Sequence, residues 1–427
     1  MNQPLTPSSS PSPAAVAHQP SLRVVAIGGG TGLSTLLRGL KRFVPAPAAS
    51  RRASDVPRSR AAFASEPRSA VPQTHTNRRA EWISPALPCI IRDLAAVVTV
   101  TDDGGSSGRL REDLKMLPPG DVRNCMVALS EDEHLLAKLF QYRFDQGDLD
   151  GHSFGNLFVA ALSEITGDFA QAVQMSSQIL ATRGRIYPAT NTNVTLAARM
   201  DDGSIVRGET SITASPHRIL ELMLEPAGVE PLPGTLDAIA NADLVTLGPG
   251  SLYTSLITNL LVRSIPEALA ATKATRVFVC NLMTQANESL GLTAAQHIEK
   301  ILQHCQNQAG SPPNLDRHSD PAQAPRAEGS EFPRAKVCHS ERSEESSHLP
   351  YPKLFDYALI NTAPISPTLL AQYAREGQTP IEPDLDRIRA LGVEPIPGNF
   401  VHEGSVLRHD PDRVTEALLK LALAGLS

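Results

Sequence analysis

Short buried strands alternate with helical patterns along most of this chain, and this alternation is the strongest restriction on its fold. Residues 22–27 (LRVVAI) are typical of a strand, and 31–43 (TGLSTLLRGLKRF) place leucines at helical spacing. Further strands are expected at 94–100, 243–247, 275–282 and 356–362, each followed by a helical run. The pattern predicts an α/β fold: a Rossmann-like, doubly wound, mostly parallel sheet with helices on both faces.

Residues 194–212 interrupt this alternation. Two runs of alternating polarity meet at Asp201-Asp202-Gly203, which is a signal for a β-hairpin. We expect the hairpin to add antiparallel strands to the sheet. The two aspartates are interpreted as turn residues and not as a binding site.

Proline marks the segments that should lie outside the core. Residues 1–21, 44–92 and 306–352 hold 19 of the 35 prolines and lack apolar periodicity. The prediction is therefore a disordered tail at 1–21 and one domain over 22–427, interrupted by low-complexity insertions at 44–92 and 306–352. Each insertion joins a helix to the next strand, so each should lie at the sheet edge opposite the loops that leave the strands.

Charge and cysteine content exclude several classes of protein. With 39 Lys and Arg against 45 Asp and Glu, the net charge is −6, and no basic stripe indicates binding to nucleic acid or an anionic membrane. The five cysteines form no C-x-x-C pair, which argues against a disulfide framework. No apolar stretch approaches the roughly 18 residues of a membrane span. We expect a cytoplasmic protein that is not embedded in a membrane.

Two glycine-rich loops follow predicted strands. Glycines in such a loop let the backbone approach a ligand, and the amides of the following helix favour phosphate. The first loop departs from the dinucleotide fingerprint, because Leu33 occupies the place of its last glycine, and a tight turn needed only for packing is the alternative. The candidate phosphate contacts are Gly28, Gly29, Gly30, Thr31 and Gly32 in the first loop, and Gly248, Gly250 and Ser251 in the second.

A third loop, TDDGGSSGR at 101–109, combines acidic, small and basic residues. Its paired carboxylates suit a divalent cation or a sugar hydroxyl, and its amides and guanidinium suit a phosphate. An acid at the end of the second strand is also where a ribose hydroxyl is held, so NAD remains open as a ligand. A solvated turn is the alternative. The candidates are Asp102, Asp103, Gly104, Gly105, Ser106 and Arg109.

Two predicted helix starts and two residues near the C-terminus complete the candidate site. Asp121 is expected to cap one helix, with Asn124 one turn further on, and Ser153 to cap another, with His152 and Asn156 at its start. His152 could bind phosphate or transfer a proton, or it could be structural. Tyr373 could offer an aromatic face to a base, and Arg408 a guanidinium to a diphosphate.

Together, the motifs GGGTGLS, TVTDDGGSSGRLR, LPPGDVRNC, GHSFGNL, ILATRGRIYPAT, LGPGSLYTS and CNLMTQ resemble the bacterial gluconeogenesis factor family (YvcK type). That family is similar to the phospholactate transferases of the CofD-like superfamily. The resemblance implies a cytoplasmic protein that binds a UDP-sugar, UDP-N-acetylglucosamine or UDP-glucose, through Tyr373 and Arg408. It also implies a role in cell shape and wall synthesis during gluconeogenic growth, with cell-wall or cell-shape proteins as partners.

The sequence departs from that family at two places. Pro411 stands where relatives can carry a phosphorylatable threonine, and Ala286-Asn287-Glu288 replaces the usual Pro-Gly-Glu. Two functions are weighed: a regulatory UDP-sugar binder without a required cofactor, and a transferase in which Asp102 and Asp103 hold Mg²⁺. The regulator is favoured because no nucleophile and base pair is evident. A homo-oligomer is left open.

Overall fold

A seven-stranded sheet, parallel throughout, forms the centre of the protein. The computed structural model describes residues 19–45, 87, 89–130, 135–309 and 353–426. The sheet order is β10-β9-β8-β7-β1-β2-β3, which confirms the predicted α/β class. Its strands are β1 (Ser21–Gly28), β2 (Ile90–Val98), β3 (Arg185–Pro188), β7 (Leu244–Leu247), β8 (Thr275–Val279), β9 (Tyr357–Asn361) and β10 (Glu394–Gly398).

The order of the strands reverses between β1 and β7. From β1 the chain adds β2 and β3 on one side, and from β7 it adds β8, β9 and β10 on the other. β1 is buried along most of its length, and its register with β7 pairs Ile27 with Leu247. In an open α/β sheet, such a switch point leaves a crevice at the carboxyl ends of the two strands, where ligands bind.

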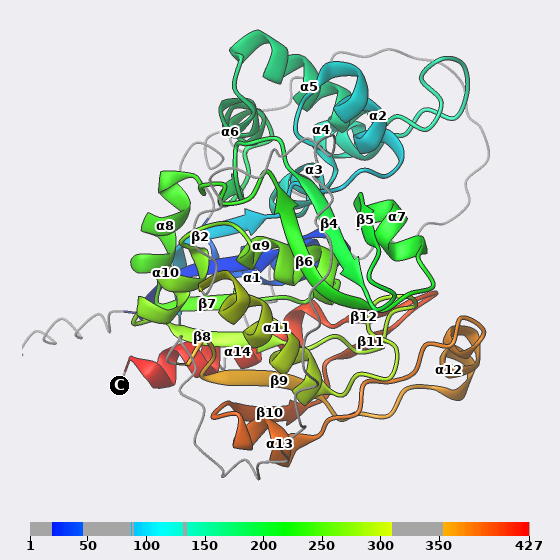
Figure 1. The fold of residues 1–427 in the computed structure, drawn as a ribbon. Helices are drawn as coiled ribbons and strands as arrows, with labels where there is room; N and C mark the ends of the chain where they lie inside the picture. The colour runs from blue at the N-terminus through cyan, green and yellow to red at the C-terminus, as the bar shows by residue number, and fades with distance from the viewer. Residues whose placement is uncertain (1–18, 46–86, 88, 131–134, 310–352, 427) are drawn as a thin grey trace, which may run out of the picture.

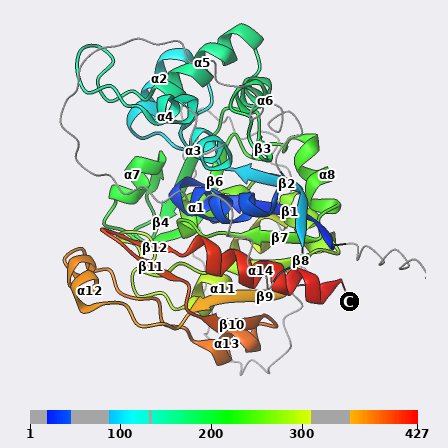
Figure 2. The ribbon, with the colours of Figure 1, turned by 180° about the vertical axis from the view of Figure 1, so that it is seen from behind.

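Helices cover both faces of the sheet. One face carries α1 (Gly30–Leu40) and α14 (Pro411–Gly425), which pack on each other (Figure 2). The other carries α10 (Ile265–Ala271), α11 (Ala294–Ala309) and the π-helical turn η4 (Leu252–Ile257), which continues into α9 (Thr258–Leu260) (Figure 1). The amphipathic spacing of Leu33, Leu36, Leu37 and Leu40 explains α1, because all four side chains are buried.

A helical layer lies beyond the β3 edge (Figure 1). It consists of α2 (Gly105–Leu114), α3 (Gly120–Leu129), α4 (Leu135–Gln141), α5 (Phe154–Thr166) and α6 (Phe169–Ile179), and α6 and α3 pack against β3. The remaining helices are α7 (Glu209–Ala214), α8 (Pro233–Ala240), α12 (Pro367–Ala374), α13 (Leu385–Ala390) and the short η1 (Lys41–Phe43). Among the described residues, no helix is both long and apolar enough to cross a membrane.

The predicted hairpin forms, but the prediction that it extends the central sheet is wrong. β4 (Thr195–Met200) pairs with β5 (Ile205–Arg207) and β6 (Ile219–Glu225) in a separate antiparallel sheet. The reason is that β6, a strand that the sequence did not predict, follows α7 and pairs with the second edge of β4. Both edges of β4 are then occupied within the small sheet. A second small hairpin joins β11 (Val401–Glu403) to β12 (Leu407–His409).

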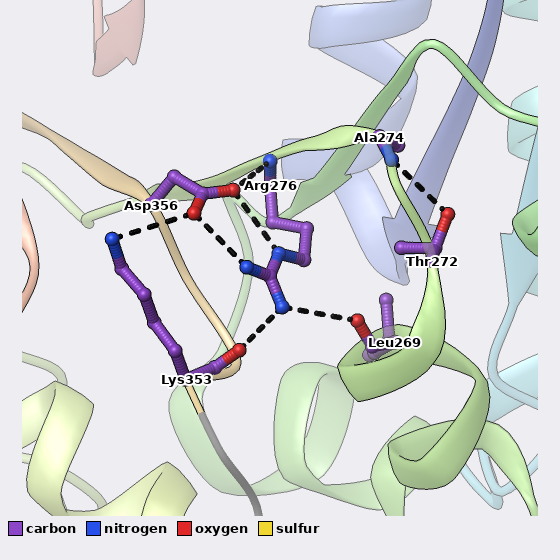
Figure 3. Close-up of polar contacts among 6 residues, drawn as sticks. All are labelled: Leu269, Thr272, Ala274, Arg276, Lys353 and Asp356. Carbon is purple, nitrogen blue, oxygen red and sulfur yellow. Dashed lines mark hydrogen bonds and ion pairs between the residues drawn. The ribbon is translucent and has the colours of Figure 1, made fainter.

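The amino ends of the strands are held by guanidinium and carboxylate pairs. Arg276 at the start of β8 binds Asp356, just before β9, through its backbone amide and its side chain, at 2.9 to 3.0 Å (Figure 3). Its guanidinium also donates to the carbonyls of Leu269 and Lys353. Arg23 on β1 binds Asp243, just before β7, in the same bidentate way.

The proposed segment boundaries need small changes. β1 begins at Ser21, inside the predicted tail, β2 begins at Ile90, inside the first predicted insertion, and α11 continues to Ala309, inside the second. The rest of both insertions and residues 1–18 lie outside the described residues. The described ends do join helix to strand as predicted, because the first insertion follows η1 and precedes β2, and the second follows α11 and precedes β9.

Candidate functional site

A cavity of about 300 Å³ opens at the carboxyl edge of the sheet, at the switch point between β1 and β7. Loops that follow β1, β7 and β8 form its floor, and residues from α12 and β12 close one side. Segments from residue 29 to residue 409 therefore meet in one place. The predicted site residues that line it are Gly29, Gly30, Thr31, Gly32, Gly250, Ser251, Tyr373 and Arg408.

The two glycine-rich loops approach each other so closely that only glycine fits. A Cβ atom on Gly32 would lie 2.3 Å from the carbonyl oxygen of Pro249, and one on Gly29 would lie 2.5 Å from Cγ2 of Thr99. Gly30 has a φ of +60°, which favours glycine. Gly28 ends β1, and Gly248 follows β7 with a φ of +89°, and neither lines the cavity.

The side chain of Asp121, a residue of α3, contacts the first residue of α1. Its carboxylate accepts a hydrogen bond of 2.8 Å from the Gly30 amide, so the expectation that it caps its own helix is wrong. The N-cap of α3 is Pro119, and the aspartate, in the first turn of that helix, faces across to the first glycine loop. Burial raises the pKa of Asp121 to about 6, and the negative charge of Asp102 adds to the shift. This carboxyl group is therefore partly protonated just below neutral pH.

Other carboxylates gather beside Asp121. Burial, with the charges of Asp121 and Asp102, raises the pKa of Glu209 to about 9, and Thr101 lies 3.4 Å from its carboxylate. Asp102 and Asp103 face different partners: Asp102 accepts from the Gly104 amide at 3.0 Å, and Asp103 accepts from Thr210. Acidic groups are thus concentrated next to the glycine loops, and in the described part of the chain none of them forms a salt bridge, although the charge of Arg123 offsets part of the pKa shift of Asp121.

The loop after β8 holds the second glycine loop in place. The Asn281 side chain accepts from the Gly250 amide at 3.2 Å and donates to the Gly250 carbonyl at 2.7 Å. Gln285 donates to the Ser251 hydroxyl at 2.9 Å. Both residues line the cavity, and the site predicted from the sequence lacked them. Their position in a loop that leaves a strand was the available signal.

Tyr373 and Arg408 both line the cavity. The Tyr373 hydroxyl accepts a hydrogen bond of 3.0 Å from the amide of Leu407, which precedes Arg408 on β12. Tyr373 therefore also fixes the strand that carries Arg408, whose side chain is exposed at the cavity. Asp410 caps α14 through bonds from the amides of Asp412 and Arg413, as expected for a residue at a helix start.

A second group of predicted site residues forms a buried network apart from the cavity lining. Ser106 Oγ lies 3.1 Å from Nδ1 of His152 and accepts from the Asn156 side chain at 3.1 Å. Ser153 caps α5 as predicted. Burial lowers the pKa of His152, so the ring is neutral at physiological pH, which favours its structural interpretation.

The remaining predicted residues of this region are also placed outside the cavity lining. Arg109 donates to the Asp150 carbonyl at 2.6 Å, Gly104 and Gly105 start α2, and Asn124 is half-buried on α3. Among the described residues, the one group of three side chains close enough to share a metal ion is Asp201, Asp202 and His217, all exposed. Asp202 accepts from Ser204, as the predicted turn requires.

The structure accounts for one departure from the related family. Asn287 has a φ of 60°, a left-handed conformation that asparagine tolerates better than most residues and that glycine adopts freely. Its side chain also donates to the Thr213 carbonyl at 2.9 Å. The backbone at this position therefore has a conformation that suits asparagine as well as glycine.

Comparison with known families identifies the fold of this site. A family model described as "2-phospho-L-lactate transferase CofD" matches residues 24–401. A gluconeogenesis factor of Halalkalibacterium halodurans is 38% identical over 399 residues, covering 93% of this chain and 95% of the relative. The gluconeogenesis factor of Bacillus subtilis is 36% identical and covers 93% of this chain and 98% of its own.

A solved structure agrees with the computed one. The crystal structure of a UPF0052 family member from Bacillus halodurans matches with a TM-score of 0.70 and 38% identity, over 94% of this chain and 99% of that one.

Proposed function

We propose, from the premise that this chain belongs to the CofD family and to its gluconeogenesis factors, that it binds a UDP-sugar at the switch-point cavity and acts as a regulator. One observation carries the proposal: the cavity joins two glycine loops to an aromatic ring and a guanidinium group from a distant part of the chain. Those are the groups that a diphosphate linked to a base and a sugar requires.

The hydrogen bonds suggest how the ligand would lie. Asp121 already accepts from the Gly30 amide, and the Leu33 amide donates to Gly29, which leaves the Thr31 and Gly32 amides without partners among the described residues. A diphosphate would sit on these two amides and lie against Gly250, whose amide is already bound by Asn281, with Arg408 neutralising the charge of the ligand. The base would then lie toward Tyr373.

A regulatory role agrees with the chemistry of the cavity. Its lining contains Ser251 and Ser255, but the Ser251 hydroxyl is already bound by Gln285, and among the described residues no histidine is hydrogen-bonded to either serine. Together with the relatives' name, gluconeogenesis factor, this favours a protein that senses a nucleotide sugar. The proposal includes a cytoplasmic location and an effect on cell shape and wall synthesis through a protein partner.

Calorimetric titration with UDP-N-acetylglucosamine, UDP-glucose, NAD and GDP, each with and without Mg²⁺, tests the proposal. We expect binding of a UDP-sugar without metal. Arg408→Ala should weaken it by about 1.5–3 kcal/mol, or about 10- to 150-fold, the range for a charge-assisted hydrogen bond. Arg389→Ala is the matched control, because that arginine pairs with Asp386 on α13, away from the cavity lining. An unchanged affinity in a folded Arg408→Ala protein would remove Arg408 from the site.

The acidic groups beside the glycine loops favour a second candidate, a Mg²⁺-dependent phospholactate-type transferase. Asp102, Asp121 and Glu209 repel one another, and a divalent cation would relieve that repulsion. Carboxylate oxygens are the donors that Mg²⁺ prefers. In this structure the three side chains are not close enough together to share one ion, so they would have to move toward it, whereas Asp103 is engaged by Thr210. A bound Mg²⁺ would supply charge neutralisation for a transferred phosphoryl group.

Nucleotide release separates the two candidates. The protein would be incubated with Mg²⁺, a nucleotide-activated phospholactate or a UDP-sugar, and candidate acceptors. Sustained turnover that disappears in Asp102→Asn would establish a transferase. If Asp102 instead holds a sugar hydroxyl, the same variant weakens UDP-sugar binding in the absence of metal and no turnover is seen in either protein.

A further inference from the structure

His409 is held in one defined tautomer at the wall of the cavity. It is the last residue of β12 and lines the cavity beside Arg408. Its Nε2 lies 3.0 Å from the backbone carbonyl oxygen of Cys280, the residue that follows β8. A carbonyl can only accept, so Nε2 carries the proton, and Nδ1 is left with a lone pair.

That lone pair has no partner in the described part of the chain. The one hydrogen bond of the imidazole there is the bond from Nε2 to Cys280. Burial lowers the pKa of His409 to about 4, so the ring stays neutral at physiological pH and Nδ1 remains an acceptor. A neutral histidine with one nitrogen anchored and the other unused is well prepared to accept a hydrogen bond from a ligand.

Three neighbouring polar side chains of the cavity are occupied or are donors. The Tyr373 hydroxyl is bound by the Leu407 amide, and the Asn281 side chain is bound on both its atoms by Gly250. Arg408 has only N–H donors. Compared with these three side chains, His409 is therefore the one with a free acceptor for a donor group of the ligand. Gln378 also lines the cavity, but its side chain is held by a hydrogen bond from its Nε2 to Glu376 and not by the backbone.

We propose that His409 is a specificity-determining residue, which accepts through Nδ1 a hydrogen bond from an N–H or O–H group on the nucleoside of the ligand. This inference rests on the proposed UDP-sugar binding and extends it. In UDP, two sources offer that chemistry: the imide N3–H of uracil and the hydroxyls of the ribose. Cytosine carries an acceptor at N3, so a contact with the imide would exclude CDP-sugars.

Two variants separate the two nitrogens. The amide of glutamine reaches about as far as Nε2, so His409→Gln can keep the bond to the Cys280 carbonyl while it removes the Nδ1 acceptor. Asparagine reaches about as far as Nδ1, so His409→Asn keeps an acceptor there and loses the anchor. Thermal unfolding of both proteins reports whether the Cys280 contact supports the fold, and calorimetry reports whether Nδ1 supports binding.

We expect His409→Gln to unfold within about 2 °C of the wild type and to bind UDP-N-acetylglucosamine about tenfold more weakly, since one unmade hydrogen bond leaves a ligand donor unpaired. His409→Asn should unfold at a lower temperature but keep more of the affinity. Titration of both proteins with UDP, N3-methyl-UDP, 2′-deoxy-UDP and 3′-deoxy-UDP identifies the donor group. The analogue that lacks the contacted donor should bind the wild type tenfold more weakly than UDP does. The same analogue and UDP should bind His409→Gln with equal affinity.

Each result decides the matter. A folded His409→Gln protein with wild-type affinity overturns the role of His409 while leaving UDP-sugar binding intact. Wild-type discrimination among the analogues that persists unchanged in His409→Gln also overturns it. If the wild type binds none of the UDP compounds, with and without Mg²⁺, the proposed function fails, and this inference fails with it.

Discussion

The two edges of the same parallel sheet are built in opposite ways. At the amino edge, the carboxylates are paired: Arg276 binds Asp356, and Arg23 binds Asp243. Burial alone would raise the pKa of Asp356, but hydrogen bonds from Arg276 outweigh it and hold that pKa below its usual range. At the carboxyl edge, Asp121 and Glu209 have raised pKa values and form no salt bridge among the described residues, and the charge of Arg123 offsets only part of the shift of Asp121.

The difference distinguishes groups that stabilise the fold from groups that are available to a ligand. The lowered pKa of Asp356 means that its charged form favours the folded state, whereas the raised pKa values of Asp121 and Glu209 mean that their charged forms oppose it. Proteins keep such unfavourable groups together mainly where a ligand or a proton uses them. If this comparison is right, mutations at the two edges should have opposite effects on stability and on binding.

The largest effect is expected at the amino edge. Arg276→Ala removes the bidentate partner of Asp356 and leaves it only the longer ion pair with Lys353, at 3.5 Å, while the Arg276 and Asp356 side chains are largely buried, at 13% and 24% exposed. Removing one member of a buried pair typically costs about 3 kcal/mol in the free energy of unfolding. Urea denaturation would measure this loss. UDP-sugar affinity of the folded protein should stay within about twofold, because Arg276 lies at the opposite edge from the cavity.

An exposed pair on the same fold is the matched control. Arg263 binds Glu230 at 3.2 Å, with side chains that are 67% and 61% exposed. Arg263→Ala should therefore lower the free energy of unfolding by less than about 1 kcal/mol. Equal losses for Arg276→Ala and Arg263→Ala would show that burial does not distinguish the amino-edge pairs.

The next largest effect is expected where the two glycine loops touch. Gly32 is in α1, where alanine would normally stabilise a helix, but its Cβ would lie 2.3 Å from the Pro249 carbonyl oxygen. Gly32→Ala should lower the free energy of unfolding by about 1–3 kcal/mol, the usual cost of overpacking. It should also weaken UDP-sugar binding more than tenfold, because the loops must separate.

Gly404→Ala serves as the comparison for that variant. A Cβ there would meet only the Val406 carbonyl oxygen, at 3.7 Å, which is ordinary contact. Both thermal unfolding and ligand affinity should therefore match the wild type. A Gly32→Ala protein that behaves in the same way would mean that the two loops move apart freely.

Much of the fold could be predicted from the sequence, because apolar periodicity is local. β1, β7, β8 and β9 lie close to the predicted strands, and the leucines of α1 are buried as expected. β3 and β10 were missed, since RIYP and EPIPG are short and contain proline, which weakens a strand pattern. The partner of the β4–β5 hairpin was missed because pairing depends on which strand returns to cover an edge.

Half of the site could be found in the same way, and the rest could not. Glycine loops at strand exits are a local signal, and they do meet in the cavity. The contact of Asp121 with Gly30 joins residues 91 positions apart, and that of Cys280 with His409 joins residues 129 apart. No spacing rule covers such pairs, because the sheet order brings them together.

Asp121 allows a direct test of the acidic edge, with a smaller effect. Its pKa in the folded protein is about 6, above the ordinary aspartate value of 3.8. The folded state therefore binds the proton more tightly than the unfolded state. This carboxyl group favours folding most below pH 4, and stability is lost as the pH rises from about 4 through 6.

Asp121→Asn should remove that loss and keep an acceptor for the Gly30 amide. We expect the variant to be more stable than wild type by about 1–2 kcal/mol at pH 7.5 and about equal to it at pH 4. Urea denaturation at both pH values, in EDTA, measures the difference. A variant that is less stable at pH 7.5 would show that the Asp121 charge helps to hold the fold.

The smallest effect should follow from shortening the two insertions. The first insertion lies between η1 and β2, and the second lies between α11 and β9. Each therefore joins the end of a helix to the start of a parallel strand, at the amino edge of the sheet. Deleting residues 48–84 and 312–350 should therefore leave UDP-sugar affinity within about threefold, or about 0.7 kcal/mol. Calorimetry on the shortened protein, with its thermal unfolding as the control for folding, measures this. Lost affinity together with an unchanged unfolding temperature would mean that an insertion reaches the carboxyl edge. Segments from both edges of the sheet would then contribute to ligand binding.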